Sequence, residues 1–169
     1  AIKNVIKNCI KTKDIKVEKL PTFDIEFLFL NIRGKSVGEE IEVTVTCQDD
    51  GETQVPVTIN LDDIKVQKNE EHTNRIKLDD KIMMEMKYPS LDQFIKNNFD
   101  FTEQNAMEQS FDLIATCIDK IFTEDEVWAV EDCSKKEIVE FLEQMNSSQF
   151  KEIEKFFETM PKLSHSIKV

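Results

Sequence analysis

Glycine and proline are scarce in this chain of 169 residues, which contains three glycines and four prolines. Average usage is about 7% glycine and 5% proline, so collagen-like chains, Gly/Ser linkers and proline-rich low-complexity chains are excluded. Enzymes that cradle phosphates in glycine-rich loops are disfavoured, and the sequence has neither a P-loop nor a GxGxxG motif. No apolar run approaches the roughly 18 residues of a membrane span, and no signal peptide is recognisable. We therefore expect no membrane-spanning segment.

Residues suited to catalysis or metal binding are also few. The two histidines are His72, which we expect to be solvated in a polar loop, and His165 near the C-terminus. The cysteines are too far apart for a CxxC zinc knuckle and too sparse for a disulfide scaffold: Cys9, Cys47, Cys117 and Cys133. Paired aspartates fall at predicted turns, where their side chains have structural roles. The sequence therefore predicts no enzyme, no metal and no cofactor.

The charge of the chain is strongly negative. It has 34 Asp and Glu against 22 Lys and Arg, a net charge of −12. Such a surface repels phosphate, so nucleic-acid binding is disfavoured, whereas a basic partner is compatible with it. The first 20 residues reverse the sign, with six lysines against Asp14 and Glu18. The simplest interpretation of these lysines is a solvated helix face.

Apolar residues at helical spacing predict two helices at the N-terminus. Residues 1–13 carry an apolar stripe opposite most of the lysines. The segment that follows Pro21 is apolar around most of its circumference, so this helix must be buried on several sides or shared with a partner. Gly34 and Gly38 are suited to its exit. The chain begins inside a helix, which leaves two interpretations open: a part of a longer protein, or removal of an initiator Met.

The hydrophobic period then changes to two. Apolar and polar residues alternate over 41–47 and 55–61, on either side of a turn containing Asp50 and Gly51, which predicts a β-hairpin with one apolar face. Pro56 lies on the opposite face and donates no N–H, so its strand is an edge strand or carries a bulge. Weaker strand patterns follow at residues 63–66, 75–78 and 81–88. We expect residues 63–66 to extend the second strand of the hairpin.

Everything after Pro89 lacks glycine and is predicted to be helical. Ser90 and Thr102 suit the N-caps of the first two helices, and the apolar stripe of the second continues to Phe122. Residues 123–126 (TEDE) have the composition of a first helical turn, where acids complement the helix dipole. Two capping boxes begin further helices: Ser134 with Glu137, and Asn146 with Gln149.

These patterns together predict an α+β fold in three parts. Residues 1–38 form an N-terminal helix pair, residues 39–89 a small antiparallel β-hairpin sheet, and residues 90–169 a C-terminal bundle of three to four helices. Phenylalanine is used 12 times and gathers in three clusters: Phe23/Phe27/Phe29, Phe94/Phe99/Phe101 and Phe150/Phe156/Phe157. Each cluster is either core or a surface for a protein partner.

Two segments carry a specific family resemblance. Residues 20–39 read LPTFDIEFLFLNIRGKSVGE, and residues 140–165 read EFLEQMNSSQFKEIEKFFETMPKLSH. They resemble the signature helix and the closing helix pair of the baseplate hub assembly chaperone family of T4-like tailed phages. Members of that family usually carry further strands and a helix before the signature helix, which favours the interpretation of this chain as part of a longer protein.

The resemblance implies a non-enzymatic role in building the central hub of the phage baseplate. Such a protein would bind hub subunits in the host bacterial cytoplasm and shield their apolar surface until the hub closes. The alternative is a structural hub component retained in the virion tail baseplate, and self-association is a further expectation. A tail-tip hydrolase and an acidic antagonist of a host protein are competing classes. The resemblance places partner contacts in the signature helix and the closing helix: Phe23, Asp24, Phe27, Arg33, Lys35, Phe156, Phe157 and Met160.

Overall fold

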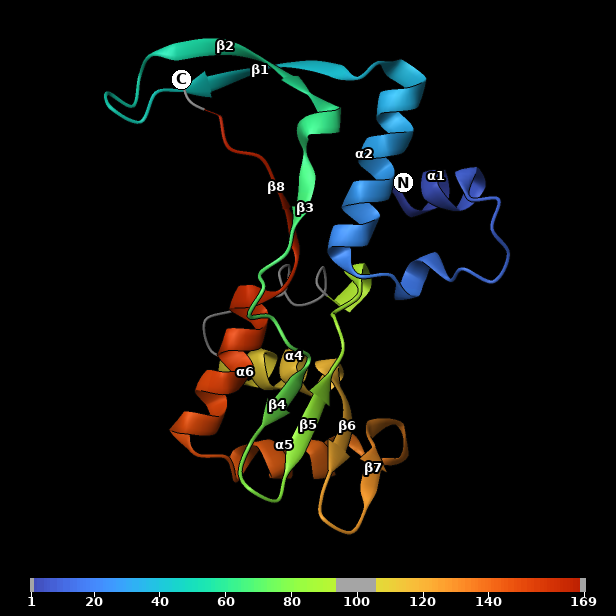
Figure 1. The fold of residues 1–169 in the computed structure, drawn as a ribbon, viewed down its shortest axis with the longest axis vertical. Coiled ribbons are helices and arrows are strands. Elements are labelled where there is room, and N and C mark those ends of the chain that lie inside the picture. The colour runs from blue at the N-terminus through green and yellow to red at the C-terminus, as the bar shows by residue number, and fades with distance from the viewer. Residues whose placement is uncertain (1, 94–105, 168–169) are drawn as a thin grey trace. The chain divides into compact units, whose positions relative to one another are not determined.

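The computed structural model describes residues 2–93 and 106–167 (Figure 1). Its contacts group the chain into two compact units, one formed by Ala1–Gln67 with Pro161–Val169 and the other by Lys68–Met160. We call them unit 1 and unit 2. The three-part division at residues 38 and 89 concerns segments along the chain, and it stays a prediction. The helix cap at Thr102 and the cluster Phe94/Phe99/Phe101 lie outside the described residues.

Unit 1 begins with the two predicted helices. Helix α1 covers Ile2–Cys9, a short 3-10 helix covers Val17–Lys19, and helix α2 covers Thr22–Val37. Pro21 stands just before α2, and Asp24 lies in its first turn, where an acid complements the helix dipole. The buried large aliphatic side chains of this unit are few among the residues described: Ile6, Val17, Ile25 and Leu61. Unit 1 therefore has a thin core of its own.

Helix α2 continues through Gly34 and ends at Gly38, which has a φ of 126°. A Cβ at Gly34 would lie 3.7 Å from Leu61 Cδ1, an ordinary contact distance. Because alanine loses less backbone entropy than glycine in a helix, Gly34→Ala should raise the free energy of unfolding by about 0.5–1 kcal/mol. Urea unfolding followed by circular dichroism measures this change. The control is Gly38→Ala, which should be destabilising because its φ disfavours alanine; a destabilised Gly34→Ala would contradict the packing described here.

The predicted hairpin is present as strands β1 (Glu40–Thr46) and β2 (Gln54–Asn60). They pair antiparallel with Val43 opposite Val57 and Thr44 opposite Pro56, so Pro56 lies on an edge strand as its missing N–H requires. In the turn, Asp50 accepts hydrogen bonds from the Thr53 hydroxyl and from the backbone N–H groups of Thr53 and Glu52, the latter two at 2.9 and 3.0 Å. These bonds lower the pKa of the Asp50 carboxyl to about 2.

A second sheet of unit 1 joins distant parts of the chain. After a 3-10 turn at Leu61–Asp63, strand β3 (Lys65–Gln67) pairs antiparallel with β8 (Lys162–Ser164), with Val66 opposite Leu163. The prediction that residues 63–66 extend the second hairpin strand is therefore wrong. Asn60 explains the break, because its side chain accepts a hydrogen bond from the Asp62 N–H at 2.9 Å and starts the turn.

The predicted C-terminal bundle of three to four helices is also wrong. Unit 2 contains a four-stranded antiparallel sheet in the order β4-β5-β6-β7, so the single hairpin sheet predicted from sequence is replaced by three sheets (Figure 1). Two of its strands come from the region predicted to be wholly helical. The bounds of this region's elements are β4 Arg75–Lys77, β5 Met83–Met86, α4 Ala106–Cys117, β6 Ile118–Phe122 and β7 Val127–Ala129.

The error arises at Ile118, where the predicted helix changes to a strand. Ile121 and Phe122 fit a helical stripe, but they also fit a strand, and here they lie opposite Met84 and Met83 of β5. Pairing with a neighbouring strand outweighs local helical spacing for such residues. Residues 123–126 are accordingly the β6–β7 turn rather than a helix start, with the Thr123 N–H donating to the Glu126 carbonyl oxygen at 2.9 Å.

The two capping boxes are confirmed. Ser134 and Glu137 start α5 (Lys135–Glu143), and Asn146 and Gln149 start α6 (Ser147–Thr159). A 3-10 turn at Val130–Asp132 connects β7 to α5. Apolar residues of these helices, of α4 and of the sheet share the main core of unit 2, whose most buried members include Met84, Ile118, Leu142 and Ile153. None of the described helices has both the length and the hydropathy needed to span a bilayer.

Candidate functional site

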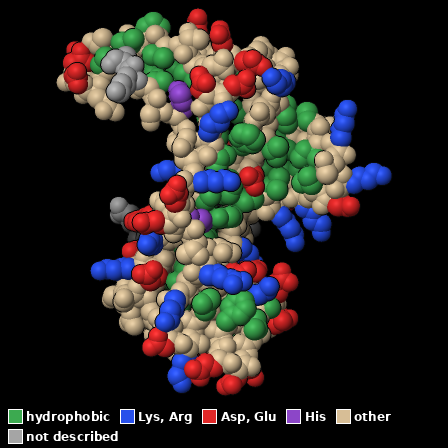
Figure 2. Space-filling view, viewed as in Figure 1, with side chains coloured by type: hydrophobic (Ala, Val, Ile, Leu, Met, Phe, Trp, Pro, Cys, Tyr) green, Lys and Arg blue, Asp and Glu red, His purple; other side chains and the backbone are tan. Residues whose placement is uncertain are grey.

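Helix α2 presents more apolar surface than unit 1 covers. Only Ile25 among its large apolar side chains is buried, and Phe27 is 38% exposed. Val37, at the end of the helix, is 77% exposed. The other members of this set are partly exposed: Phe23, Leu28, Phe29, Leu30 and Ile32. Figure 2 shows hydrophobic side chains at the surface over the part of the molecule that Figure 1 assigns to α2. An apolar surface of this kind on a highly charged protein is suited to a protein contact.

Arg33 adds an unsatisfied donor to this helix. Its Nη1 atom is buried and has no hydrogen-bond partner among the residues described. A guanidinium donor without an acceptor costs free energy, and a carboxylate or carbonyl from another chain would remove that cost. Lys35 differs, because it forms an ion pair with Glu39, and their hydrogen bond raises the pKa of the Lys35 ammonium. Arg33 is therefore the better placed of the two cations for an external partner.

The remaining predicted residues of α2 are partly engaged within the protein. Phe23 and Asp24 are half-buried, and both have interactions inside the structure. Phe27 thus stands out as the exposed member of the set. The structure brings Phe27 and Arg33 onto the same helix, as the sequence predicts, although their role in partner binding stays a prediction.

The second predicted set lies in unit 2. Phe156 is only 2% exposed, and its ring centroid lies 5.2 Å from that of His72 and 5.7 Å from that of Tyr88. Phe157 and Met160 are half-buried. Phe156 therefore packs in the core of unit 2, and the proposed contact surface does not include it.

His72 is not the solvated loop residue predicted from sequence. Its Nδ1 atom lies 2.9 Å from the Thr159 hydroxyl and its Nε2 atom lies 2.9 Å from the Tyr88 hydroxyl. Burial lowers the pKa of the His72 imidazole. No sequence signal points to this arrangement, because the three partners are far apart along the chain. His72 links the loop before β4 to helix α6 by a hydrogen bond, so its role here is structural.

The described residues show little chemistry for catalysis. Cys117 is completely buried, and burial raises the pKa of its thiol to about 12, so it is protonated at neutral pH. No group of three or more His, Cys, Asp and Glu suited to a metal ion occurs within residues 2–93 and 106–167. These observations do not identify a reaction that the protein would catalyse.

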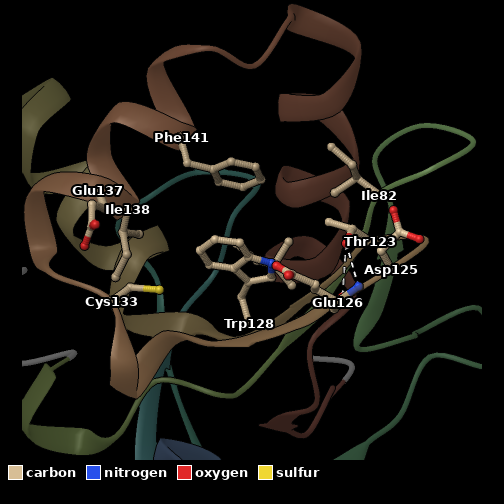
Figure 3. A pocket seen from close by; sticks show the side chains of 10 residues that line it. Ile82, Thr123, Asp125, Glu126, Trp128, Cys133, Glu137, Ile138 and Phe141 are labelled. Atoms are coloured by element: carbon tan, nitrogen blue, oxygen red, sulfur yellow. Dashed lines mark hydrogen bonds between the residues drawn. The ribbon is translucent and has the colours of Figure 1, made fainter.

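Sequence reasoning missed a hollow in unit 2. It has a volume of about 480 Å³, and the Trp128 and Phe141 rings face one another across it (Figure 3). Trp128, on the edge strand β7, is 52% exposed. Acidic residues surround the apolar rings, among them Asp125, Glu126 and Glu137. The available signal is the TEDE segment, whose composition predicts a helix start but which forms the hairpin turn beside this pocket.

The comparisons with known proteins agree with part of the resemblance. The family described as T4 bacteriophage base plate protein matches residues 1–169. Neither the comparison with curated proteins nor that with solved structures gives a match. The family match covers every residue of the chain and supports an association with the phage baseplate and its components. This chain belongs to the T4 bacteriophage base plate protein family.

Proposed function

We propose that this protein assists assembly of the central hub of the baseplate by binding hub subunits through α2, without catalysing a reaction. The observation that carries the proposal is the exposed apolar surface of α2, with Phe27 at 38% exposure in a unit that has a thin core. Membership of a baseplate family supports a baseplate protein as the partner. The signature motif at residues 20–39 supports the hub in particular, since it resembles hub assembly chaperones.

The physical basis is coverage of apolar surface on both partners. A hub subunit awaiting its neighbours exposes apolar surface, and such surface aggregates unless another chain covers it. The apolar side of α2 would bind there, and a partner acceptor that reaches Arg33 Nη1 would satisfy a donor that has no partner within the described chain. We place this activity in the host bacterial cytoplasm, and the net charge of −12 makes nucleic acid an unfavourable partner.

Co-expression with the hub subunits of the same phage tests the proposal. Affinity capture followed by mass spectrometry should recover a hub subunit with the wild-type chain. Phe27→Asp should reduce the recovered subunit about tenfold or more, because a charge replaces a central apolar contact. The matched control is Met83→Asp in unit 2, where Met83 is 39% exposed, and capture should be unchanged. Equal capture by wild type and Phe27→Asp would contradict the assignment to α2.

Purified virions distinguish the two forms of this role. An assembly factor is released before the particle is complete, so mass spectrometry of purified tails should not detect it at the copy number of a hub subunit. A structural hub component would be present there in stoichiometric amounts. If no hub subunit is captured by the wild-type chain and tails also lack it, the hub proposal fails in both forms.

A further inference from the structure

We propose that the acidic groove of unit 2 binds the basic N-terminal segment of a second copy of this chain. The acidic groove is the hollow around Trp128, Phe141 and Ile138 with Asp125, Glu126 and Glu137 at its rim (Figure 3). The basic segment is residues 2–19. This contact joins two different surfaces, so it is a head-to-tail association, which closes into a ring or continues as a filament. It involves neither Phe27 nor Arg33 and does not rest on the hub proposal.

The groove combines an apolar floor with an unneutralised acidic rim. Its volume of about 480 Å³ is within the range of roughly 300–1,000 Å³ typical of binding pockets. An adjoining hollow shares Trp128 and adds Asp132 and Val127, which is 61% exposed. A half-exposed Trp is the kind of aromatic anchor that protein contacts use.

The two lysines in the first turn of α5 are occupied by other carboxylates. Lys135 forms an ion pair with Asp112 at 2.8 Å, and Lys136 forms one with Glu140 at 3.4 Å. The carboxylates of Asp125, Glu126 and Asp132 have no ion pair within the part of the chain that the structure describes. Glu137 is held ionised, because hydrogen bonds from the Ser134 hydroxyl and backbone lower its pKa. The groove therefore calls for an occupant that has both apolar side chains and positive charge.

The basic segment has that composition and is exposed. Helix α1 turns Ile6 into unit 1, where it is fully buried, but it leaves Ile2 and Val5 44% and 40% exposed. Cys9 is exposed as well. The positions 2, 5 and 9 follow the i, i+3, i+7 spacing by which a helix lays one side into an apolar groove. The second apolar side of α1 is thus without a covering element in the described structure.

Lysines follow this apolar side along the chain. Lys11, Lys13 and Lys16 are exposed and form no ion pair among the described residues. In Figure 2, Lys and Arg side chains project from the part of the surface where Figure 1 places α1 and the segment after it. Opposite charges on two surfaces favour their encounter and set their orientation. Charge and apolar spacing together select the basic segment as the occupant of the acidic groove.

Light scattering after size exclusion tests the association on the full chain. The average mass of the wild-type chain should rise above 19.7 kDa as the protein concentration increases to several hundred micromolar. High salt should reverse the rise. A chain that stays monomeric at every concentration overturns the proposal, whether or not another basic protein binds the groove.

A mixing experiment assigns the two surfaces. The groove variant Glu126→Lys/Asp132→Lys keeps its basic segment, and the segment variant Val5→Asp/Lys11→Glu/Lys13→Glu keeps its groove. Each should be monomeric alone, whereas an equimolar mixture should form a dimer capped at both ends. The matched control Glu154→Lys/Glu158→Lys makes the same charge change on α6 and should associate like wild type. Circular dichroism establishes that each variant is folded, and folded variants that do not dimerise on mixing overturn the proposal.

Discussion

Leu142→Ala should lower the free energy of unfolding of unit 2 by about 2–5 kcal/mol, the largest single effect that we expect in this protein. Leu142 lies on α5 and is completely buried among the side chains of the sheet and α6. Truncation removes burial of apolar surface and leaves a cavity that a rigid core fills only in part. Since the whole stability of a domain is about 5–15 kcal/mol, this change takes away a large fraction of it.

Urea unfolding followed by tryptophan fluorescence measures the effect within unit 2, because Trp128 is the only tryptophan of the chain. The matched control is Leu113→Ala on α4, where the side chain is only half-buried, so the loss should be clearly smaller. A loss below about 1 kcal/mol for Leu142→Ala would show that α5 does not pack as described.

His72 should make the stability of unit 2 depend on pH. Thr159 donates its hydroxyl proton to the Lys155 carbonyl oxygen at 2.7 Å, so its oxygen must accept from His72 Nδ1–H. His72 Nε2 then accepts from the Tyr88 hydroxyl, and the imidazole is neutral. Because the folded pKa lies below the ordinary value of 6.5, the unfolded chain binds a proton first as pH falls.

Stability from His72 should therefore be fully present above pH 6.5 and should decline as pH falls through the folded pKa. Carboxylates titrate mainly below about pH 5. Burial raises the pKa of Glu26, but this residue lies in unit 1, so Trp128 fluorescence between about pH 7 and 5.5 reports on histidine in unit 2. Unfolding in urea at several pH values, read from Trp128 fluorescence, measures the decline. His165→Ala should retain it, since His165 is exposed in the C-terminal segment. A decline of equal size in His72→Ala would contradict the assignment.

His72→Ala should also be destabilising at pH 7. It removes two hydrogen bonds and the ring contacts with Tyr88 and Phe156, and it leaves the Tyr88 hydroxyl without this acceptor. The expected loss is about 1–3 kcal/mol. His165→Ala is again the matched control, and its stability should equal that of wild type.

Local hydrogen bonding is the part of this fold that sequence predicts well. The capping boxes at Ser134 and Asn146 each close within three residues, so their donors and acceptors are near one another in any conformation. The hairpin of β1 and β2 is predictable for a similar reason, since alternation and an Asp-Gly turn specify it locally. For the candidate site, the sequence predicts that α2 has more apolar surface than one small unit covers, because its apolar residues lie around most of the helix.

Long-range pairing is where sequence reasoning failed. Ile118, Ile121 and Phe122 satisfy helical and strand spacing equally, and only the presence of β5 makes the strand more stable. The acidic groove depends on the same decision, because Trp128 becomes an edge-strand residue only when β6 exists to pair with β7. A sequence pattern that favours helices in this segment therefore cannot predict the acidic groove.

The sequence by itself determined the acidic character of this protein, the helix starts at Ser134 and Asn146, the first hairpin and the membership of a baseplate family. The tertiary structure alone decided the four-stranded sheet, the pairing of β3 with β8, and the position of His72 between Tyr88 and Thr159. The physical reason is distance along the chain. Local preferences act between residues within one turn, whereas these features gain their free energy from partners that only folding brings together.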